Sequence, residues 1–433
     1  MALIDRLSAI WDGCDEPFLI FDGHPLHFGS LRHAVSPGLA SVQPGDVVAL
    51  IADFDPAGIA TLLALIDVGA VVVPLTVQTR EDHPYFFDAA GVDVVIEGDT
   101  ATRRHGHDPH QLVLQLRQLG HPGLVLFSSG TTARPKAILH DLTHFLRRFN
   151  TPRPSLRTLN FLLFDHIGGL NTLLHTLFNR GTVVALRDRS IDRVLRTCRD
   201  HAVEVLPTTP TFLRMMLISG AIPDAVPACL KVITYGTERM DLPTLQQACA
   251  LLPAVDFRQT FGMSELGIVR VKSLARDSLF MTIGGEGVET RVVDDVLHIR
   301  AQARMMGYLN APSPFDADGW YDTRDVVEQL GRAIKVVGRL SDLINVGGLK
   351  FMPSEVERVV LTYPGVSMAL AHGRRNPITG QHVELKVQAQ DHLEIDAATL
   401  TAFLKERLPP HMRPRRVTFE AIAVGHRFKK AGQ

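Results

Sequence analysis

The sequence predicts an α/β protein in which a large N-terminal domain of packed β-sheets and helices is followed by a small C-terminal α/β domain. The 433 residues can form two or more domains with sizeable cores. Apolar runs at 47–51 and 71–75 have the length of buried strands, and the helical spacing of 58–68 between them makes a βαβ unit. Beyond about residue 339 a further strand and an amphipathic helix recur, which indicates the smaller domain.

Composition argues against several classes of function. Lysine and arginine (45) balance aspartate and glutamate (46), so the net charge of −1 provides no general attraction to nucleic acid or to a membrane surface. The most apolar window, 58–75, is interrupted by Asp67, Gly69 and Pro74, which favours a core segment over a membrane span. No signal peptide is evident, and four scattered cysteines without metal-ligand spacing are typical of reduced thiols. We therefore expect a cytoplasmic protein.

The most informative stretch is 124–136, in which a buried strand of four apolar residues leads into a turn of small hydroxylated residues. Such a turn exposes backbone N–H groups, and its small side chains let an oxyanion approach closely. Arg134 and Lys136 add positive charge nearby. The spacing differs from that of a Walker loop. The chemistry nevertheless indicates a nucleotide polyphosphate, bound by Ser128, Ser129, Gly130, Thr131, Thr132 and Lys136.

Three later strands are expected at 203–207, 231–235 and 257–259, and each runs into a turn rich in Gly, Thr or Ser. Because parallel strands present such turns at one edge of a sheet, these turns are expected to lie at the ligand edge. A hairpin follows at 290–299. In the smaller domain, Ser354 and Glu357 have the spacing of a capping box that begins a helix. The apolar stripe of the last expected helix consists of Leu400, Phe403, Leu404 and Leu408.

Five blocks of the chain, in order, resemble the adenylate-forming superfamily of acyl-CoA synthetases, luciferases and the adenylation domains of peptide synthetases. They are the phosphate loop 128–136, FDHIGGL at 164–170, TFGMSE at 260–265, GWYDTRD at 319–325, and GRLSDLINVGGLKFMPSEVE at 338–357. The resemblance covers the chain from about Asp46 to its end. It departs from the family at Ala133 and Arg324, where Gly is usual, and at Ser341, where Asp or Lys is usual.

The resemblance implies roles for the residues around ATP. The phosphate loop would hold the phosphates, and Glu265 would help to hold Mg²⁺ against them. Phe261 would stack on adenine, which Gly236 and Thr237 would border. Asp325 would accept both ribose hydroxyls, and Arg339 would contact ribose and phosphate.

The string at 164–170, which is expected to line the acyl pocket, matches the patterns of two enzyme classes. His166 and the following glycines look like the FHxxGL string of CoA ligases, whereas Phe164-Asp165 matches half of the FDxS string of amino-acid-activating domains, whose Asp holds the substrate amine. Both interpretations, a CoA ligase and an amino-acid-activating domain, stay open. By the same resemblance, the pocket would be lined by Asp165, His166, Gly169, Tyr235, Gly262 and Met263.

The resemblance also implies two domains, 1–338 and 339–433, with a hinge near Ser341. Rotation of the mobile smaller domain would bring Gly347, Gly348 and Lys350 to the site for the thiol step. The family ends in a loop whose Lys reaches the substrate carboxylate and the α-phosphate. Lys429 or Lys430 fits that catalytic position, together with Arg339.

The implied function is activation of a carboxylic acid by ATP and Mg²⁺ as an acyl-adenylate, followed by transfer to CoA or to the phosphopantetheine thiol of a carrier protein. Basic residues outnumber acidic ones between 405 and 430, which suits an anionic thiol donor. Three alternatives stay open. They are an amino-acid-activating domain that uses Asp165, a non-catalytic nucleotide-binding homologue, and an oxidative enzyme of the luciferase type, for which nothing in the sequence argues.

Overall fold

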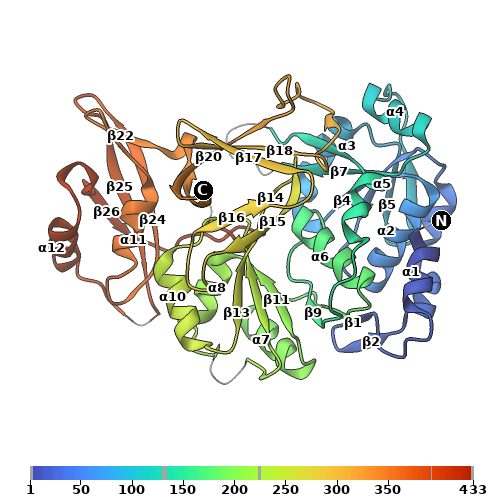
Figure 1. Ribbon diagram of the computed structural model, residues 1–433, viewed down its shortest axis with the longest axis horizontal. Helices are drawn as coiled ribbons and strands as arrows, with labels where there is room; N and C mark the ends of the chain where they lie inside the picture. Colours follow the sequence, from blue (N-terminus) through green and yellow to red (C-terminus); the bar gives the residue numbers. More distant parts are fainter. Residues whose placement is uncertain (1–2, 129–133, 223–225, 392, 431–433) are drawn as a thin grey trace.

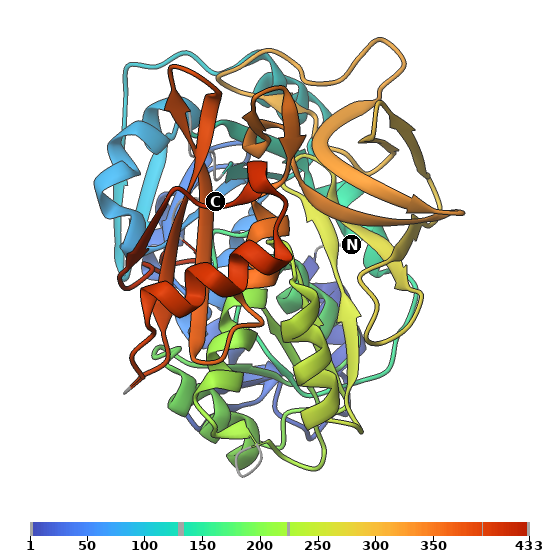
Figure 2. The same cartoon turned by 90° about the vertical axis from the view of Figure 1, so that its left-hand side faces the viewer.

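The computed structural model describes residues 3–128, 134–222, 226–391 and 393–430. Three seven-stranded sheets form a large domain, and a five-stranded sheet with two helices forms a small C-terminal domain at one side of it (Figure 1). The small domain covers one face of the large domain when it is viewed from that side (Figure 2). The predicted α/β fold class, with a large sheet-rich domain and a small C-terminal domain, is therefore confirmed. Among the described residues, no helix is long and apolar enough to span a membrane.

The first sheet carries most of the strands expected to end in ligand-binding turns. Its order is β13-β12-β11-β9-β10-β1-β2, and all neighbours are parallel except the pair β1 and β2. Thr208 pairs with Tyr235 and Tyr235 with Gln259, so three strands end side by side, as expected. The strands are β1 (Leu19–Phe21), β2 (His24–Leu26), β9 (Thr158–Leu159), β10 (Val183–Ala185), β11 (Val205–Thr208), β12 (Val232–Tyr235) and β13 (Asp256–Gln259).

The second sheet contains the predicted βαβ unit, whose strands β3 and β4 pair in parallel. Its order is β19-β8-β7-β4-β3-β5-β6. The strands are β3 (Val47–Ile51), β4 (Val71–Leu75), β5 (Val94–Glu97), β6 (Thr100–Arg103), β7 (Gly123–Phe127), β8 (Ala137–Asp141) and β19 (Gly307–Tyr308).

The third sheet is antiparallel, with the order β14-β15-β16-β21-β20-β18-β17. It includes the predicted hairpin, whose turn residues Asp294 and Asp295 both have positive φ. The strands are β14 (Phe261–Met263), β15 (Gly267–Ser273), β16 (Met281–Gly284), β17 (Val288–Val293), β18 (Val296–Ala301), β20 (Tyr321–Leu330) and β21 (Ala333–Arg339).

The small domain has the strand order β23-β22-β25-β24, and β26 pairs with β25. Its helices α11 (Pro353–Val360) and α12 (Ala397–Arg407) contribute to a core of their own, which includes the predicted Leu400, Leu404 and Leu408. The strands are β22 (Ile344–Val346), β23 (Leu349–Phe351), β24 (Val366–Asn376), β25 (Gly380–Ala389) and β26 (Arg416–Phe419).

Helices of the large domain pack on the sheets in separate cores. One core joins α1, α2 and α6 with the first and second sheets, and another joins α7, α8 and α10 with the first sheet. The α-helices are α1 (Leu3–Trp11), α2 (Pro56–Val68), α3 (His83–Ala90), α4 (Gln111–Leu119), α5 (Leu142–Phe145), α6 (Ile167–Phe178), α7 (Ile191–Asp200), α8 (Pro210–Ile218) and α10 (Leu242–Leu251). Short 3₁₀ helices occupy Phe28–Ala34, Pro37–Ser41, Val77–Asp82, Leu146–Phe149, Leu340–Asp342 and Pro410–Met412.

The capping box at the start of α11 differs from the prediction. The box consists of the N-cap residue Met352 and the N3 residue Glu355, whose carboxylate accepts from the Met352 N–H at 2.9 Å. Ser354 instead donates to the Val337 carbonyl at 2.9 Å. The prediction was wrong because Pro353 suits the first turn of a helix and shifts the cap two residues earlier than Ser354. Glu357 is therefore available for contacts outside its own helix.

Helix α6 begins beside the candidate acyl residues and packs closely on the preceding turn. A methyl group on Gly169 would overlap the carbonyl oxygen of Leu163, which is backbone. A methyl group on Gly168 would meet the end of the Leu162 side chain, which can rotate away. Gly169 thus lets the helix approach the turn that carries Asp165 and His166.

Gly169→Ala is expected to lower the free energy of unfolding by about 1–3 kcal/mol, because the backbone of the turn must move to accept the methyl group. Gly168→Ala, one residue earlier in the same helix, is the matched control and should cost less. Urea denaturation of the two variants measures the difference. Equal losses would show that the close approach at Gly169 is unimportant for stability.

Candidate active site

Hydrogen bonds between Ser128 and Lys136 join the two ends of the phosphate loop at its base. Ser128 donates its N–H to the Lys136 carbonyl at 3.0 Å, and the Lys136 N–H donates to Ser128 Oγ at 3.0 Å. Asn310 Oδ1 accepts from the Ala137 N–H at 2.9 Å and so fixes the strand that leaves the loop. The other predicted loop residues, Ser129, Gly130, Thr131 and Thr132, lie outside the described residues.

Lys136 and Glu265, which are far apart in the sequence, meet at the tyrosine ring of β19. Lys136 Nζ lies 4.7 Å from the centroid of the Tyr308 ring, and Tyr308 Oη donates to Glu265 Oε1 at 2.8 Å. Burial and the Glu265 carboxylate raise the pKa of Tyr308, so the phenol keeps its proton and remains a donor. The structure thus brings together a cation of the phosphate loop and the carboxylate expected beside Mg²⁺.

The chemistry of Glu265 fits a magnesium ion that is also held by phosphates. Among the described residues, Glu265 Oε2 has no hydrogen-bond or ion-pair partner, so one carboxylate oxygen is available as a ligand. No group of three or more His, Cys, Asp or Glu side chains in that part of the chain could hold a metal alone. Such a donor set suits Mg²⁺, which is commonly bound by one or two carboxylates, waters and substrate phosphates.

The turn after β12 has an unusual backbone and an unpaired hydroxyl. Thr237 has φ 72°, which glycine adopts more readily than threonine. Its buried Oγ1 has no hydrogen-bond partner among the described residues. A side chain at Gly236 would overlap Thr260, so the two turns touch. Strain and an unpaired polar atom at a sheet edge are typical of a ligand site.

Asp325 lies in β20 and pairs with Arg339 of the neighbouring β21. Arg339 Nε is 3.4 Å from Asp325 Oδ1, and the Arg339 side chain is largely exposed. Burial raises the pKa of Asp325 to about 6, against the opposing effect of Arg339. Arg324, which departs from the family, has φ 57° and therefore keeps the backbone conformation that glycine would favour.

The candidate acyl residues include two polar side chains at the start of α6, Asp165 and His166. Nδ1 of His166 accepts from the Gly168 N–H at 3.0 Å and caps α6, so its neutral ring carries the proton on Nε2. Burial lowers the pKa of His166 well below its ordinary value, and the nearby Lys429 and Arg427 act in the same direction. Asp165 is also buried. Tyr235 packs in the core of the first sheet.

Gly262 and Met263, the other two residues expected at the acyl pocket, lie in β14. They pair with Ile268 and Gly267 of β15. A side chain at Gly262 would meet the Gly267 carbonyl. The hairpin that carries the Glu265 turn is thus closely packed at this point.

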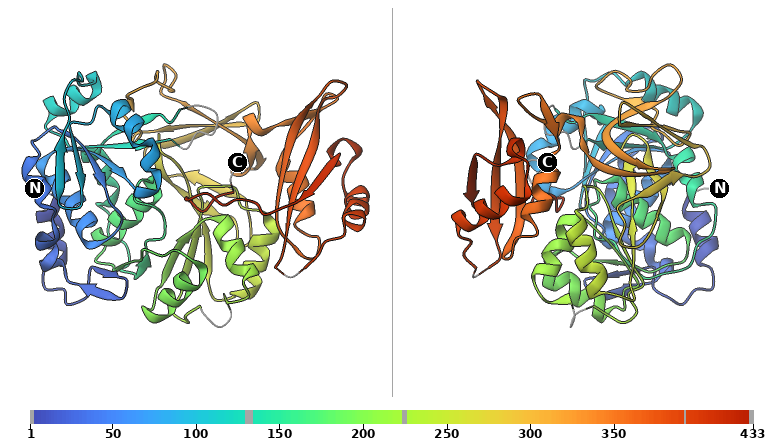
Figure 3. Two further views of the ribbon diagram at one scale, coloured as in Figure 1. Left: turned by 180° about the vertical axis from the view of Figure 1, so that it is seen from behind. Right: turned by 60° about the vertical axis from the view of Figure 1, so that its left-hand side comes forward.

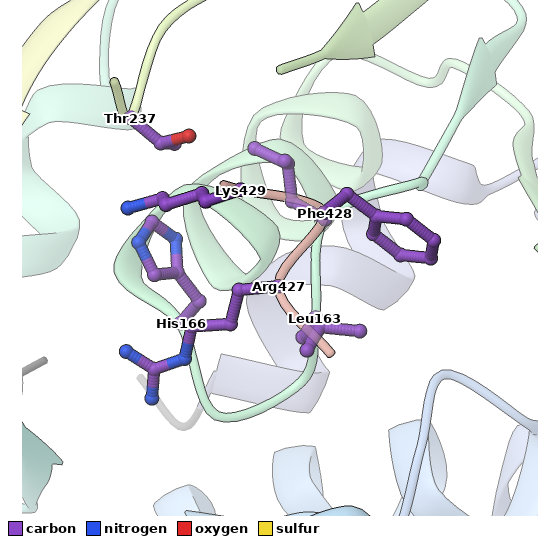
Figure 4. Close-up of a pocket in the computed structure, with 7 residues that line it drawn as sticks. Leu163, His166, Thr237, Arg427, Phe428 and Lys429 are labelled. Carbon is purple, nitrogen blue, oxygen red and sulfur yellow. The ribbon is translucent and has the colours of Figure 1, made fainter. Parts of the chain in front are cut away.

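The C-terminal segment crosses from the small domain to the large one (Figure 3). Residues 425–429 form a tight turn in which the Gly425 N–H donates to the Lys429 carbonyl at 2.9 Å. Phe428 has φ 55° at this turn, a conformation that glycine favours. Lys429 lies beside His166 and Thr237, whereas Phe428 points away from them (Figure 4).

The two candidate lysines have different surroundings. Burial lowers the pKa of Lys429 to about 8, and the neighbouring Arg427 adds to the effect. Lys430 Nζ instead donates to the Ala369 carbonyl of the small domain at 3.1 Å. Of the two, Lys429 therefore lies at the edge of the first sheet, and Lys430 ties the turn to β24.

The candidate hinge and thiol residues lie away from this cluster. Ser341 is exposed between β21 and β22, and its Oγ donates to Asp342 Oδ1 at 2.9 Å. The Gly347 N–H donates to the Thr379 carbonyl at 2.9 Å, and the Gly348 N–H to Asn345 Oδ1 at 3.0 Å. These two glycines form the hairpin turn between β22 and β23, and the exposed Lys350 lies in β23.

Sequence reasoning missed several residues of the site. Tyr308 lies in a short string without a motif, and its link between Lys136 and Glu265 depends on the sheet order. Arg427 forms an ion pair with Asp165, with 3.2 Å between Nη2 and Oδ2. Glu238 accepts from the Thr211 N–H at 2.7 Å, and burial raises its pKa. No spacing rule could have found these partners, which lie 27 to 262 residues apart.

Comparisons with known proteins agree with this arrangement. Residues 14–309 match the model of the AMP-binding enzyme family, and residues 355–422 match that of the AMP-binding enzyme C-terminal domain. A 3-[(3aS,4S,7aS)-7a-methyl-1,5-dioxo-octahydro-1H-inden-4-yl]propanoyl:CoA ligase of Rhodococcus jostii (strain RHA1) is 27% identical over 312 residues, which is 68% of this chain and 61% of that protein. The fatty acid–[acyl-carrier-protein] ligase ScoC of Streptomyces coeruleorubidus is 27% identical over 332 residues, 69% of this chain and 63% of that one. The matches thus span less than two thirds of these relatives.

Solved structures resemble the whole fold. The amide bond synthetase McbA from Marinactinospora thermotolerans has a TM-score of 0.79 at 21% identity, covering 99% of this chain and 98% of that one. ATP-bound MatB from Rhodopseudomonas palustris has a TM-score of 0.79 at 20% identity, covering 99% and 97%. The matched family models, the fold and the ordered blocks lead to one conclusion: the chain belongs to the AMP-binding enzyme family of the adenylate-forming superfamily.

Proposed function

We propose that the protein activates a carboxylic acid with ATP as an acyl-adenylate, releases pyrophosphate, and transfers the acyl group to a thiol. The observation that carries the proposal is the position of Lys429, whose pKa burial lowers to about 8, beside Thr237 and His166 at the ends of the parallel strands. Ligands of open α/β sheets bind at this edge. The names of the two curated relatives, a CoA ligase and an acyl-carrier-protein ligase, agree with it.

In the first step, a carboxylate oxygen of the acid attacks the α-phosphorus of ATP, and the bond to pyrophosphate breaks. An ionised acid needs no general base, so positioning and charge stabilisation supply the catalysis. Lys429 would stabilise the negative charge that develops on the α-phosphate oxygens. When bound, Mg²⁺ would neutralise phosphate charge beside Glu265 and Lys136.

The remaining candidate residues would bind the nucleotide and the acid. Asp325 and Arg339 would hold the ribose, and Phe261 would stack on adenine beside Gly236 and Thr237. The phosphate loop, 128–132 with Lys136, would hold the phosphates. The neutral His166, with its proton on Nε2, would donate to the acid carboxylate or to the adenylate. The acyl group would extend along Asp165, Gly169, Tyr235, Gly262 and Met263.

In the second step, a thiolate would attack the acyl carbon and release AMP. We propose that the domains divide at 1–338 and 339–433, with a hinge at Ser341. The exposure of Ser341 between β21 and β22 supports this, as does the gap between the two family models, from 309 to 355. Rotation there would exchange the Lys429 turn for the hairpin with Gly347, Gly348 and Lys350.

The acceptor would be CoA or the phosphopantetheine of a carrier protein, both of which are anionic. Arg415 and Arg416 are exposed on the small domain and could attract either. Arg413 has a structural role instead, because its guanidinium donates to the Leu408 carbonyl at 2.9 Å and to the Lys405 carbonyl at 2.7 Å. These two bonds cap the end of α12.

Lys429→Ala is expected to slow adenylate formation by roughly 10²–10³-fold, because a transition-state contact is lost. Transfer from a pre-formed acyl-adenylate to the thiol should continue. Lys430→Ala, the adjacent control, removes the hydrogen bond to the Ala369 carbonyl and a charge near Glu238, and should give a much smaller loss. Pyrophosphate release in a single turnover measures the first step. A larger defect in Lys430→Ala than in Lys429→Ala would reverse the assignment.

The lowered pKa of Lys429 predicts that the rate of adenylate formation decreases at alkaline pH. Because the cation is the active form, kcat/KM for adenylate formation should fall as the pH rises above about 8. In Lys429→Arg the guanidinium stays charged, so whatever activity remains should not fall in that range. A wild-type profile that stays flat up to pH values near 10, the ordinary range of lysine, would contradict the role of Lys429.

The raised pKa of Asp325 predicts a loss of ribose binding on acidification. Adenosine is a suitable probe because it lacks phosphates that titrate in this range. Since the carboxylate is the hydrogen-bond acceptor and has a pKa of about 6, adenosine should bind about tenfold more weakly near pH 5 than near pH 7.5. Asp325→Asn should bind weakly at both pH values in calorimetry. If that variant keeps the wild-type pH dependence, another group is responsible.

A further inference from the structure

The C-terminal turn is joined to the large domain by an ion pair inside the site. Arg427 Nη2 lies 3.2 Å from Asp165 Oδ2, and the exposed fractions of the two side chains are only 17% and 6%. Among the described residues, Asp165 Oδ1 and Arg427 Nε have no hydrogen-bond partner although both atoms are buried. The pair spans 262 residues and joins the two domains. Because the pair is buried, removing either partner would destabilise this contact by leaving the other charge buried and uncompensated.

The residue between Arg427 and Lys429 anchors the turn by packing. The Phe428 ring lies 4.6 Å from Phe161 and 5.4 Å from Phe212 between ring centroids. Thr209 Oγ1 donates to the Phe428 carbonyl at 2.6 Å. Figure 4 shows Arg427 and Lys429 on one side of the turn and Phe428 on the other. Lys429 therefore follows two residues that are each fixed to the large domain.

We infer that the Arg427–Asp165 ion pair positions Lys429 for adenylate formation and compensates the negative charge of Asp165. The carboxylic acid substrate therefore carries no cationic group next to Asp165. The inference rests on the proposed function. Arg427 is a positioning residue, since it acts through the turn that carries Lys429. A substrate ammonium group would have to displace a guanidinium that is already held against the same carboxylate. The alternative of an amino-acid-activating domain is therefore disfavoured.

The pair also bears on the two steps differently. Arg427 and Phe428 together hold the turn that carries Lys429, so adenylate formation depends on the ion pair. Rotation of the small domain for thiol transfer must break it. Removing the pair should therefore impair the first step and spare the second, whereas a residue that only stabilised the fold would affect both steps alike.

The experiment compares Arg427→Gln, Asp165→Asn and the double variant with the wild type. Single-turnover adenylate formation should fall by about 10²-fold in Arg427→Gln, because Lys429 is misplaced. Transfer from a pre-formed adenylate should stay near the wild-type rate. The double variant should lose less than the two single losses combined, because the partners act as a unit. Arg375→Gln, which alters an exposed arginine of β24, is the control.

Hydrogen exchange of the peptide that covers 420–430 provides a readout that is independent of activity. Exchange should increase in Arg427→Gln and in Asp165→Asn but not in Arg375→Gln. Unchanged exchange, or equal losses in both half-reactions, would overturn the positioning role. If the wild type formed no adenylate while the exchange changed as expected, the docking would stand and the proposed function would fail.

A matched pair of acids tests the second part of the inference. Phenylalanine and 3-phenylpropanoate share one skeleton and differ only in the ammonium group. The wild type should favour 3-phenylpropanoate in pyrophosphate release, since Asp165 is occupied by Arg427. Preferred activation of phenylalanine would overturn the neutralisation of Asp165 by Arg427.

Discussion

The proposed chemistry depends on the docking of one short turn, 425–429, onto the large domain. Residues of the three large sheets would bind the phosphates, the ribose and magnesium, but the lysine that completes the site belongs to the small domain. Its approach buries two cations next to each other. Asp165 compensates one of them, and burial lowers the pKa of Lys429. The position of Lys429 is thus a property of the interface between the domains.

Other contacts across this interface are polar as well. Arg214 donates to the carbonyls of Val366 and Ser367, and Arg239 lies 3.3 Å from the buried Glu357 carboxylate. These are single hydrogen bonds and ion pairs, and the Phe428 ring adds apolar packing. An interface of this kind can separate without exposing a large apolar surface. It suits the proposed rotation of the small domain after the first step.

Much of the fold could be predicted from the sequence because its signals are local. The apolar runs of the βαβ unit are set by neighbouring residues, and the structure agrees with them. Residues of the site with strong motifs, such as Asp325 and Glu265, could be named for the same reason. Asp165 was recognised as ambiguous, yet its partner could not be found, since an ion pair across 262 residues leaves no periodic signal. Arg324, where the family usually has Gly, has a positive φ that glycine adopts more readily, and this conformation depends on the surrounding contacts and not on residue type alone.

The most direct measurement of the central claim is the fate of a carboxylate oxygen. The acid is labelled with ¹⁸O in its carboxylate and incubated with ATP, the protein and a thiol, and the AMP is examined by mass spectrometry. If the carboxylate attacks the α-phosphorus and the thiolate later breaks the acyl C–O bond, one labelled oxygen must appear in AMP. Unlabelled AMP, or label in inorganic phosphate with formation of ADP, would contradict the account.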